Sequence, residues 1–258
     1  MRLLASQVAD ATGGRLSGRD VEVDGASFDS RATRPGELFV PIVAERDGHD
    51  FIEAALGAGA SAYLTTEEPL ETGTAIRVAD TSAALMTLAA WARRRLDIPV
   101  VGVTGSVGKT STKDLIAAAL GASRKVTANE RSFNNEQGLP VTILGTPDDA
   151  DVLVVEMGMR GFGEIGRLCA VAGPTVGVVT AVAASHTGRV GGIEGVAVAT
   201  RELVERLPAA GTAILTADDE RVARMGGHTP AGVLTYGLRG EVRMSSIELD
   251  DLARPSFR

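Results

Sequence analysis

The stretch that decides the fold is 98-IPVVGVTGSVGKTSTKDLIAAAL-120, in which a glycine-rich turn separates a run of β-branched residues from an apolar pattern at helical spacing. A strict phosphate loop has a glycine five positions before Gly108, but Val103 stands there. Backbone N–H groups of residues 105–110 can still converge on a phosphate at the N-terminus of the following helix. Lys109 adds an ammonium for a triphosphate, and Thr110 adds a hydroxyl for Mg²⁺. We therefore predict a nucleotide-binding loop; the alternative is an ordinary glycine turn between strand and helix.

Strand-like and helix-like patterns alternate after this loop, which argues for an α/β fold with a parallel sheet. The preceding part mixes short strands and helices with frequent turn signals, and a helical pattern over 81–96 ends shortly before Pro99. We predict a small α/β domain over residues 1–97 and a P-loop-type, parallel-sheet ATPase domain over residues 98–258. The second domain is expected to have strands at PVVGV, KVTA, DVLVVEM, TVGVVTAV and AILTA, and helices near 110–120, 163–172 and 193–207.

Composition narrows the classes of function. A net charge of −7 argues against a nucleic-acid binder, which would carry a basic face. The single cysteine, Cys169, can form neither an intrachain disulfide nor a cysteine metal cluster, and a reduced, buried thiol fits the cytoplasm. We find no cleavable signal pattern and no apolar stretch of about 20 residues that could span a bilayer. The sequence predicts a soluble cytoplasmic protein without membrane insertion.

Several segments resemble the Mur ligase superfamily. VTGSVGKTSTK is similar to the family's ATP loop, and FDSRATRPGELFVPI with DGHDFIEAALGAGASA is similar to the amino-terminal UDP-sugar domain of MurE- and MurF-type enzymes. Three further segments resemble the MurF type: SFNNEQGLPVTIL, VVEMGMRGFGEIGRLCAVAGPTVGVVT and SHTGRVGGIEGVA. MurE-type chains usually have a threonine-rich stretch where this chain has Asn134-Asn135-Glu136. Residues from about 20 to the last one take part in the resemblance.

The resemblance implies a reaction and its partners. Enzymes of this type use ATP and Mg²⁺ to join D-alanyl-D-alanine to UDP-N-acetylmuramoyl tripeptide in peptidoglycan precursor synthesis. The substrate carboxylate takes the γ-phosphate to become an acyl phosphate, and the dipeptide amine then displaces phosphate. Because phosphorylation gives the carboxylate a leaving group, the protein's part is to position the reactants and to neutralise phosphate charge. We expect a monomer.

The resemblance also implies roles for particular residues. The catalytic residues would be Lys109, Glu156 and His186. The ATP contacts would be Gly105, Ser106, Val107, Gly108, Lys109, Thr110 and Ser111. Mg²⁺ would be held by Thr110, Glu156 and His186, and the UDP substrate would be contacted by Ser30, Arg31, Asn134 and Asn135.

Each assignment has a structural alternative. Glu156 ends an apolar run, where a carboxylate suits Mg²⁺, but it could be a capping or salt-bridged acid. His186 could be a packed or surface histidine. Asp-Ser-Arg at 29–31 could cap backbone groups in a turn, and the two asparagines could be ordinary turn residues. Asp47-Gly48-His49 matches the family as well, but it could be a helix cap, and we leave His49 out of the site.

Two departures from the family pattern matter. The family carries a carbamylated lysine for a second Mg²⁺ on the helix after the histidine segment; Thr200 takes that place, and no lysine follows Lys125. The second metal could instead be held by Glu202 or by water, or it could be weakly bound. The chain also resembles only the first half to two-thirds of a MurF-type ligase, and we expect it to be an incomplete, inactive piece of one. The alternatives are a MurE-like or folylpolyglutamate-synthetase-like ligase, and a non-catalytic nucleotide-binding module.

Overall fold

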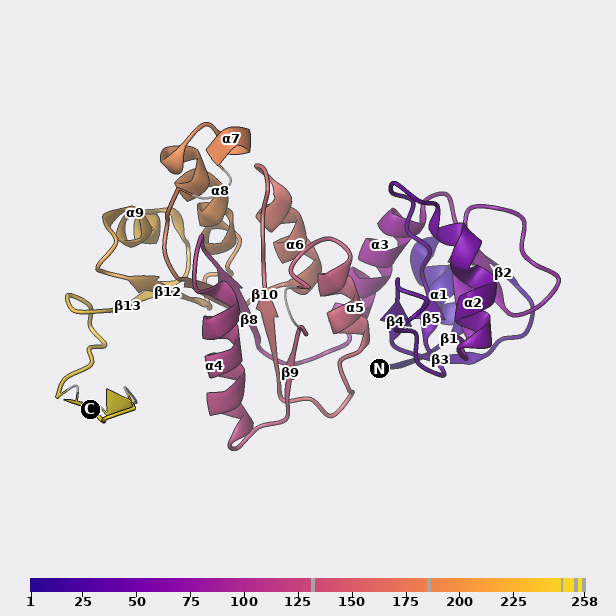
Figure 1. Cartoon of the computed structure of the whole chain (residues 1–258), viewed down its shortest axis with the longest axis horizontal. Helices are drawn as coiled ribbons and strands as arrows, with labels where there is room; N and C mark the ends of the chain where they lie inside the picture. Colours follow the sequence, from indigo (N-terminus) through magenta and orange to yellow (C-terminus); the bar gives the residue numbers. More distant parts are fainter. Residues whose placement is uncertain (131–132, 185–186, 247, 253–254, 257–258) are drawn as a thin grey trace.

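The computed structural model has two units of strands and helices that meet at helix α3 (Thr81–Arg93) (Figure 1). It describes residues 1–130, 133–184, 187–246, 248–252 and 255–256, with the side chains of residues 187 and 255 left out. The predicted α/β fold class is confirmed. The division of the chain at residues 97–98 stays a prediction.

The first unit is built on a mixed sheet of short strands. Its elements are β1 (Arg2–Leu4), α1 (Ala5–Thr12), β2 (Arg15–Ser17), β3 (Glu22–Asp24), β4 (Ala26–Ser27), β5 (Leu38–Phe39), η1 (Gly48–Phe51), α2 (Ile52–Gly57), β6 (Ala62–Thr65) and β7 (Ala75–Arg77). Within the described residues the sheet order is β2–β7–β6–β5–β4, with β2 antiparallel to β7 and the other pairs parallel. The apolar run at 37–45 forms only the short β5, because the chain soon turns back into the Val43–Asp47 bridge.

The second unit is built on a parallel sheet. Its strands are β8 (Val100–Thr104), β9 (Val126–Ala128), β10 (Val152–Glu156), β11 (Val176–Val179), β12 (Thr212–Thr216) and β13 (Gly232–Tyr236). In the part of the chain that the structure describes, their order is β13–β12–β11–β8–β10–β9. Strand β8 therefore lies between β10 and β11, and the loops that follow all three strands emerge at one edge.

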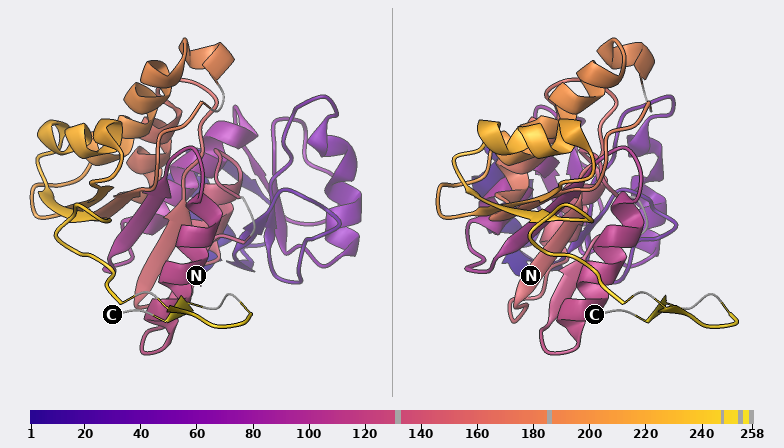
Figure 2. Two further views of the ribbon diagram at one scale, coloured as in Figure 1. Left: turned by 60° about the vertical axis from the view of Figure 1, so that its left-hand side comes forward. Right: turned by 90° about the vertical axis from the view of Figure 1, so that its left-hand side faces the viewer.

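Helices cover both faces of this sheet (Figure 2). They are α4 (Lys109–Gly121), α5 (Gly138–Leu144), α6 (Glu164–Ala172), α7 (Thr187–Val190), α8 (Ile193–Glu205), α9 (Glu220–Arg224) and η2 (Met225–His228). Side chains alternate between faces along a strand. Val101 and Val103 accordingly pack with Ile116 and Leu120 of α4. The opposite face, reached by Val100, joins the core that includes residues of α5, α6 and α8.

Helix α3 takes part in both units. It packs against α1 on one side and against α5 and α6 on the other. Its buried Leu85, Leu88 and Ala92 belong to one continuous apolar core whose members range from Met1 to Met225. The two sheets are therefore joined by shared packing as well as by the chain between α3 and β8.

The last described elements form a small hairpin of β14 (Glu248–Leu249) and β15 (Pro255–Ser256), which stands apart from the central sheet (Figures 1 and 2). Strand β13 is the sheet edge on this side and is partly open to solvent, with Val233 41% and Leu234 37% exposed. Among the described residues, no helix is both long enough and apolar enough to cross a membrane.

Candidate active site

The phosphate loop joins the end of β8 to the start of α4 at the carboxyl edge of the central sheet. Its glycines have backbone angles that other residues rarely adopt, with φ at +137° for Gly105 and +80° for Gly108. A Cβ added to Gly105 would lie only 2.1 Å from Oγ1 of Thr180. Glycine is required at position 105 both by the backbone and by the close approach of the segment after β11.

Hydrogen bonds fix this loop against the segment after β11. The Ser106 amide donates to the Ala181 carbonyl over 2.8 Å, and the Ser106 hydroxyl accepts from the Ala183 amide over 2.9 Å. The Thr180 hydroxyl donates to the carbonyl of Val107, whose side chain is exposed. These hydrogen bonds hold the loop in one conformation, and Ser106 contributes to it with both its backbone amide and its hydroxyl.

Lys109 starts α4 and turns its ammonium over the loop. Its Nζ donates to the Gly105 carbonyl over 2.7 Å and lies 3.4 Å from the Ser106 carbonyl. Ser111 follows in the first turn and is exposed. A lysine ammonium beside the N-terminus of a 13-residue helix makes this end of the sheet suited to phosphate.

Glu156 ends β10 and brings the predicted site residues together. Its side chain is 1% exposed. Oε2 accepts from the Thr110 hydroxyl over 2.7 Å, and Oε1 accepts from the Asn134 amide over 2.6 Å. Among the described residues, Glu156 neither caps a helix nor takes part in a salt bridge. A carboxylate and a hydroxyl side by side next to a phosphate loop form the oxygen donor set that Mg²⁺ prefers, so Thr110 and Glu156 fit a magnesium ion.

Asn134 lines a cleft of 480 Å³ together with residues of the phosphate loop, whereas Thr110 and Glu156 are not part of its described lining. Gly158 forms part of its wall, and a Cβ there would lie 2.8 Å from the Asn134 side chain. The lining residues are Gly105, Ser106, Lys109, Asn134, Asn135, Glu136, Gln137, Gly158, Met159, Arg160, Glu164 and Leu168. The phosphate loop and the asparagine pair thus share one space.

Asn135 has a second role in this wall. Its Oδ1 accepts from the amides of Gln137 and Gly138, over 3.1 and 2.9 Å. Helix α5 starts at Gly138, so Asn135 caps it. Asn135 therefore acts as a turn residue through its side-chain oxygen, which was the structural alternative for the two asparagines. The Asn134 side chain instead donates to Glu156.

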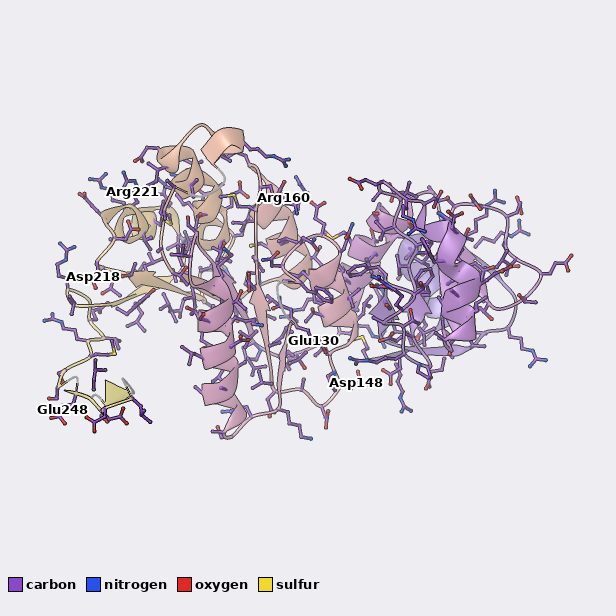
Figure 3. All side chains as sticks on the ribbon, in the orientation of Figure 1. Glu130, Asp148, Arg160, Asp218, Arg221 and Glu248 are labelled. Carbon is purple, nitrogen blue, oxygen red and sulfur yellow. The ribbon has the colours of Figure 1, made fainter. Side chains whose placement is uncertain are left out.

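Seven residues that line the cleft were not predicted as site residues, and Arg160 and Glu164 are two of them. Arg160 is exposed and lies on the loop that leads into α6 (Figure 3). Glu164 accepts from the Arg160 amide over 2.6 Å at the start of that helix. Both stand in the EMGMRGFGEIG segment, but the sequence alone does not show that this loop bends back over the cleft.

Ser30 and Arg31 lie in the first unit, between β4 and β5. Arg31 is paired with Asp29 through 2.9 and 2.7 Å hydrogen bonds, which hold the pKa of the Asp29 carboxyl below its usual value. The turn reading of Asp-Ser-Arg is therefore visible in the structure. The described lining of the 480 Å³ cleft includes neither Ser30 nor Arg31. The segment of Ser30 and Arg31 contacts the segment of the cleft wall through two aromatic rings. Phe28, two residues before Ser30, lies with its ring centroid 5.7 Å from that of Phe133, which directly precedes Asn134.

Two further residues from the sequence analysis, Thr200 and Glu202, can be placed, whereas His186 lies outside the described residues. Thr200 is buried on α8, 1% exposed. Glu202 accepts from the amides of Gly163 and Gly166, over 2.5 and 2.8 Å. It thereby satisfies the N-terminus of α6, so the carboxylate that could have replaced the missing lysine is committed to a helix end.

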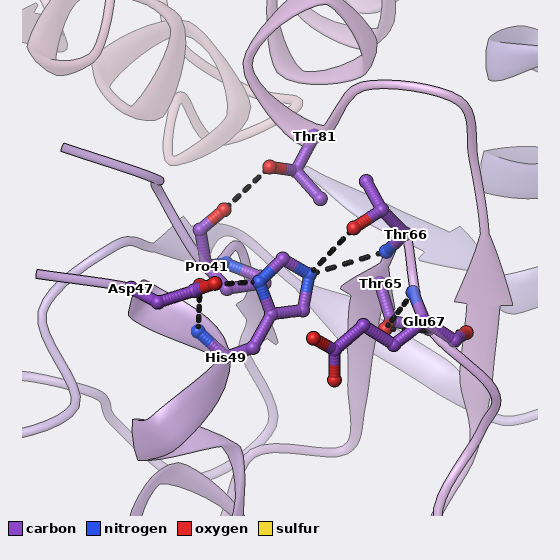
Figure 4. Close-up of polar contacts among 7 residues, drawn as sticks. All are labelled: Pro41, Asp47, His49, Thr65, Thr66, Glu67 and Thr81. Atoms are coloured by element: carbon purple, nitrogen blue, oxygen red, sulfur yellow. Dashed lines mark hydrogen bonds and ion pairs between the residues drawn. The ribbon is translucent and has the colours of Figure 1, made fainter.

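The Asp47-Gly48-His49 motif forms a structural hydrogen-bond network (Figure 4). Asp47 caps η1, as its oxygen accepts from the His49 amide over 2.9 Å. The Thr66 amide donates to His49 Nε2 over 3.1 Å, so the ring proton of a neutral imidazole lies on Nδ1 and faces Asp47 at 2.6 Å. Glu67 lies near enough to complete a group of three candidate metal ligands. Both ring nitrogens are already in use, which accounts for the buried histidine without a metal.

Comparison with known proteins agrees with this geometry. Residues 103–255 match the model of the Mur ligase middle domain, and the chain belongs to the Mur ligase family. A relative from Synechocystis, named UDP-N-acetylmuramoyl-tripeptide–D-alanyl-D-alanine ligase, is 40% identical over 86% of this chain and 50% of its own length. The chain spans about half the length of the curated relatives it matches.

Solved structures give the same assignment. MurF from Acinetobacter baumannii superposes with a TM-score of 0.87 at 26% identity, over 96% of this chain and 56% of that one. MurF from Thermotoga maritima in complex with ADP has a TM-score of 0.78 at 28% identity, over 89% of this chain and 54% of that one. The predicted resemblance to MurF-type ligases is confirmed.

Proposed function

We propose that this chain supplies the UDP-substrate-binding and ATP-binding parts of a MurF-type ligase, which joins D-alanyl-D-alanine to UDP-N-acetylmuramoyl tripeptide. The observation that carries the proposal is Glu156, whose two carboxylate oxygens accept from Thr110 of the phosphate helix and from Asn134 of the cleft wall. One carboxylate thus connects the nucleotide side of the cleft to the substrate side. The names of the Synechocystis relative and of the two MurF structures support the same choice.

The chain's own residues would divide the work. Lys109 would neutralise phosphate charge, while Thr110 and Glu156 would hold Mg²⁺. Asn134, beside them, would contact the muramoyl peptide and present its carboxylate. Bound Mg-ATP would supply the phosphoryl group that converts this carboxylate into an acyl phosphate. Ser30 and Arg31 would contact the uridine part in the first unit. We further propose a monomeric, cytoplasmic protein.

A non-catalytic nucleotide-binding module is the second candidate. Thr200 favours it, because a buried threonine on α8 cannot be carbamylated and Glu202 already caps α6. The phosphate loop and Glu156 would be retained in such a module. It would bind nucleotide with Mg²⁺ and would show no specific affinity for the UDP-linked peptide.

Calorimetric titration tests the proposal. The chain is titrated with Mg-ATP and, separately, with UDP-N-acetylmuramoyl tripeptide, and each ligand is expected to bind. Lys109→Ala should abolish ATP binding and leave binding of the UDP substrate in place. Lys125→Ala is the matched control, since Lys125 is exposed and paired with Asp149. Unchanged ATP affinity in Lys109→Ala would refute the phosphate loop. Binding of ATP without the UDP substrate would favour the non-catalytic module.

A further inference from the structure

Asn129, just after β9, is a buried junction between the parts of the site. It is 1% exposed, and its side-chain oxygen, side-chain nitrogen and backbone carbonyl each contact a different part of the fold. Its Oδ1 accepts from the Glu156 amide over 2.8 Å, and its Nδ2 donates to the Phe133 carbonyl over 3.1 Å. Its own carbonyl accepts from Lys113 Nζ over 2.7 Å. One side chain and one carbonyl therefore join β10, the cleft wall and the phosphate helix.

Lys113 is an unusual residue for this position. It lies one helical turn after Lys109 on α4, and only 3% of it is exposed. Lysine is rare in this chain, at positions 109, 113 and 125, with arginine at the other basic positions. A charged ammonium is costly to bury unless it is hydrogen bonded. Asn129 and the neighbouring Asp114, 2.8 Å from Nζ, meet part of that need.

This junction fixes the positions of the residues proposed to bind the metal and the substrate. Asn129 fixes the backbone of Glu156, whose carboxylate is the proposed Mg²⁺ ligand. It also fixes the carbonyl of Phe133, which precedes Asn134. Asn134 in turn donates to Glu156 over 2.6 Å, and its carbonyl accepts from the Gly158 amide over 2.8 Å. A shift of Asn129 would therefore move both the metal ligand and the substrate contact.

We propose that Asn129, held by Lys113, is the positioning residue that sets Glu156 and Asn134 in register with the phosphate helix. The proposal rests on the proposed function, because it assigns Mg²⁺ to Glu156 and the substrate peptide to Asn134. Neither Asn129 nor Lys113 touches a reacting atom in this assignment. They act through the groups that they orient, as residues behind a metal ligand commonly do.

The experiment measures the Mg²⁺ dependence of ATP binding for the whole chain and for Asn129→Ala and Lys113→Met. A fluorescent ATP analogue is titrated at several Mg²⁺ concentrations and without Mg²⁺. Loss of support behind a metal ligand typically weakens metal affinity by about 10- to 100-fold. The Mg²⁺ concentration that gives half-maximal binding should rise by that factor in both variants, and affinity for UDP-N-acetylmuramoyl tripeptide should fall. Metal-free ATP affinity should stay within about twofold, since the phosphate loop is untouched.

Controls separate this proposal from the proposed function. Lys125→Met removes an exposed lysine and should match the parent chain throughout. If Asn129→Ala no longer unfolds cooperatively on heating, it is not correctly folded, and the Mg²⁺ dependence of Lys113→Met then tests the positioning role. An unchanged Mg²⁺ midpoint in the variants, with a Mg²⁺-dependent parent, would overturn the positioning role. So would an equal loss of metal-free affinity, which indicates a general packing defect. A parent chain whose ATP binding ignores Mg²⁺ would instead refute the proposed function.

Discussion

Glu156 is the residue on which most of the site depends. Its carboxylate accepts hydrogen bonds from two side chains while it is almost fully buried. Replacing one carboxylate oxygen with an NH₂ donor therefore disrupts one of these two hydrogen bonds. An amide nitrogen at this position would face either the Thr110 hydroxyl or the Asn134 amide, both of which donate to the carboxylate.

Glu156→Gln should therefore remove the strengthening of ATP binding by Mg²⁺, while metal-free ATP binding persists through Lys109. Calorimetry with and without Mg²⁺ measures the two cases. Glu205→Gln is the matched control, because the exposed Glu205 carboxylate pairs with Arg201 away from the cleft lining. Retention of full Mg²⁺ dependence in Glu156→Gln would place the metal elsewhere.

Cys169 leads to a pH prediction. Burial on α6 raises the pKa of its thiol from 9.0 to about 12. Unfolding exposes the thiol, so above pH 9 the unfolded chain loses a proton that the folded chain keeps. This contribution to stability is complete below pH 9 and is lost as the pH rises toward 12, at about 1.4 kcal/mol per pH unit.

Cys169→Ala should make the free energy of unfolding fall less steeply with pH above pH 9, because the variant lacks the one proton that the Cys169 thiol contributes to the slope. Urea unfolding from pH 8.5 to 10.5 measures the slope, and the buried tyrosines contribute equally to both proteins. A lower free energy of unfolding of the variant at every pH does not affect the test, which compares only how steeply that free energy changes with pH in the two proteins. Parallel slopes would show that the thiol is accessible in the folded chain.

At the scale of elements, the conformation of the phosphate loop depends on Gly105. Gly105→Ala forces a side chain into a backbone region that glycine alone adopts easily, and against Thr180. We expect ATP binding to be lost and stability to fall by about 1–3 kcal/mol. Gly121→Ala, at the end of α4 with open space around it, should be neutral or stabilising by about 0.4–1 kcal/mol. Thermal unfolding and calorimetry on both variants measure the contrast.

Local sequence predicted the elements that are buried and regular. Strands β8, β10 and β11 are short and rich in valine, and α4 follows a glycine loop, so their patterns are visible without the rest of the chain. Helix α5 was missed, because Gly138 and Pro140 look like turn signals. The helix forms because Asn135 caps it and because Leu139 and Ile143 are buried in the core shared with α3.

The same contrast holds for the site. The order of Gly105, Lys109 and Thr110 is a local pattern, and the position of Glu156 follows from the end of a strand. The role of Asn129 could not be predicted, because its partners Glu156 and Lys113 are 27 and 16 residues away in sequence. Such a junction is created by the tertiary fold, and no spacing rule reveals it.

At the scale of the whole molecule, Arg93 fastens the connection between the units. Its guanidinium donates to the carbonyls of Ala172, Leu96 and Ile98, over 2.8, 2.5 and 3.0 Å. It therefore ties the end of α6 to the chain that leads from α3 to β8. Glu130, which is labelled in Figure 3, adds an exposed ion pair of 3.4 Å with Arg34 between the units, and this pair contributes little by comparison.

Arg93→Met should leave these carbonyls without their donor and lower stability by about 1–3 kcal/mol. The melting temperature would fall by about 2–4 °C for each kcal/mol in a chain of this size. Arg94→Met is the matched control, because Arg94 is exposed at the same helix end. Equal melting temperatures for the two variants would show that the connection is held by packing alone.

Helix α3 also has a consequence for synthesis on the ribosome. The helix is complete at residue 93, but its partners α5 and α6 end only at residues 144 and 172. Translation at about 5–20 residues per second leaves the α3 surface that will face them uncovered for several seconds. During that interval the nascent chain displays an apolar stripe that the first unit cannot cover by itself, and this stripe is where a chaperone would engage it.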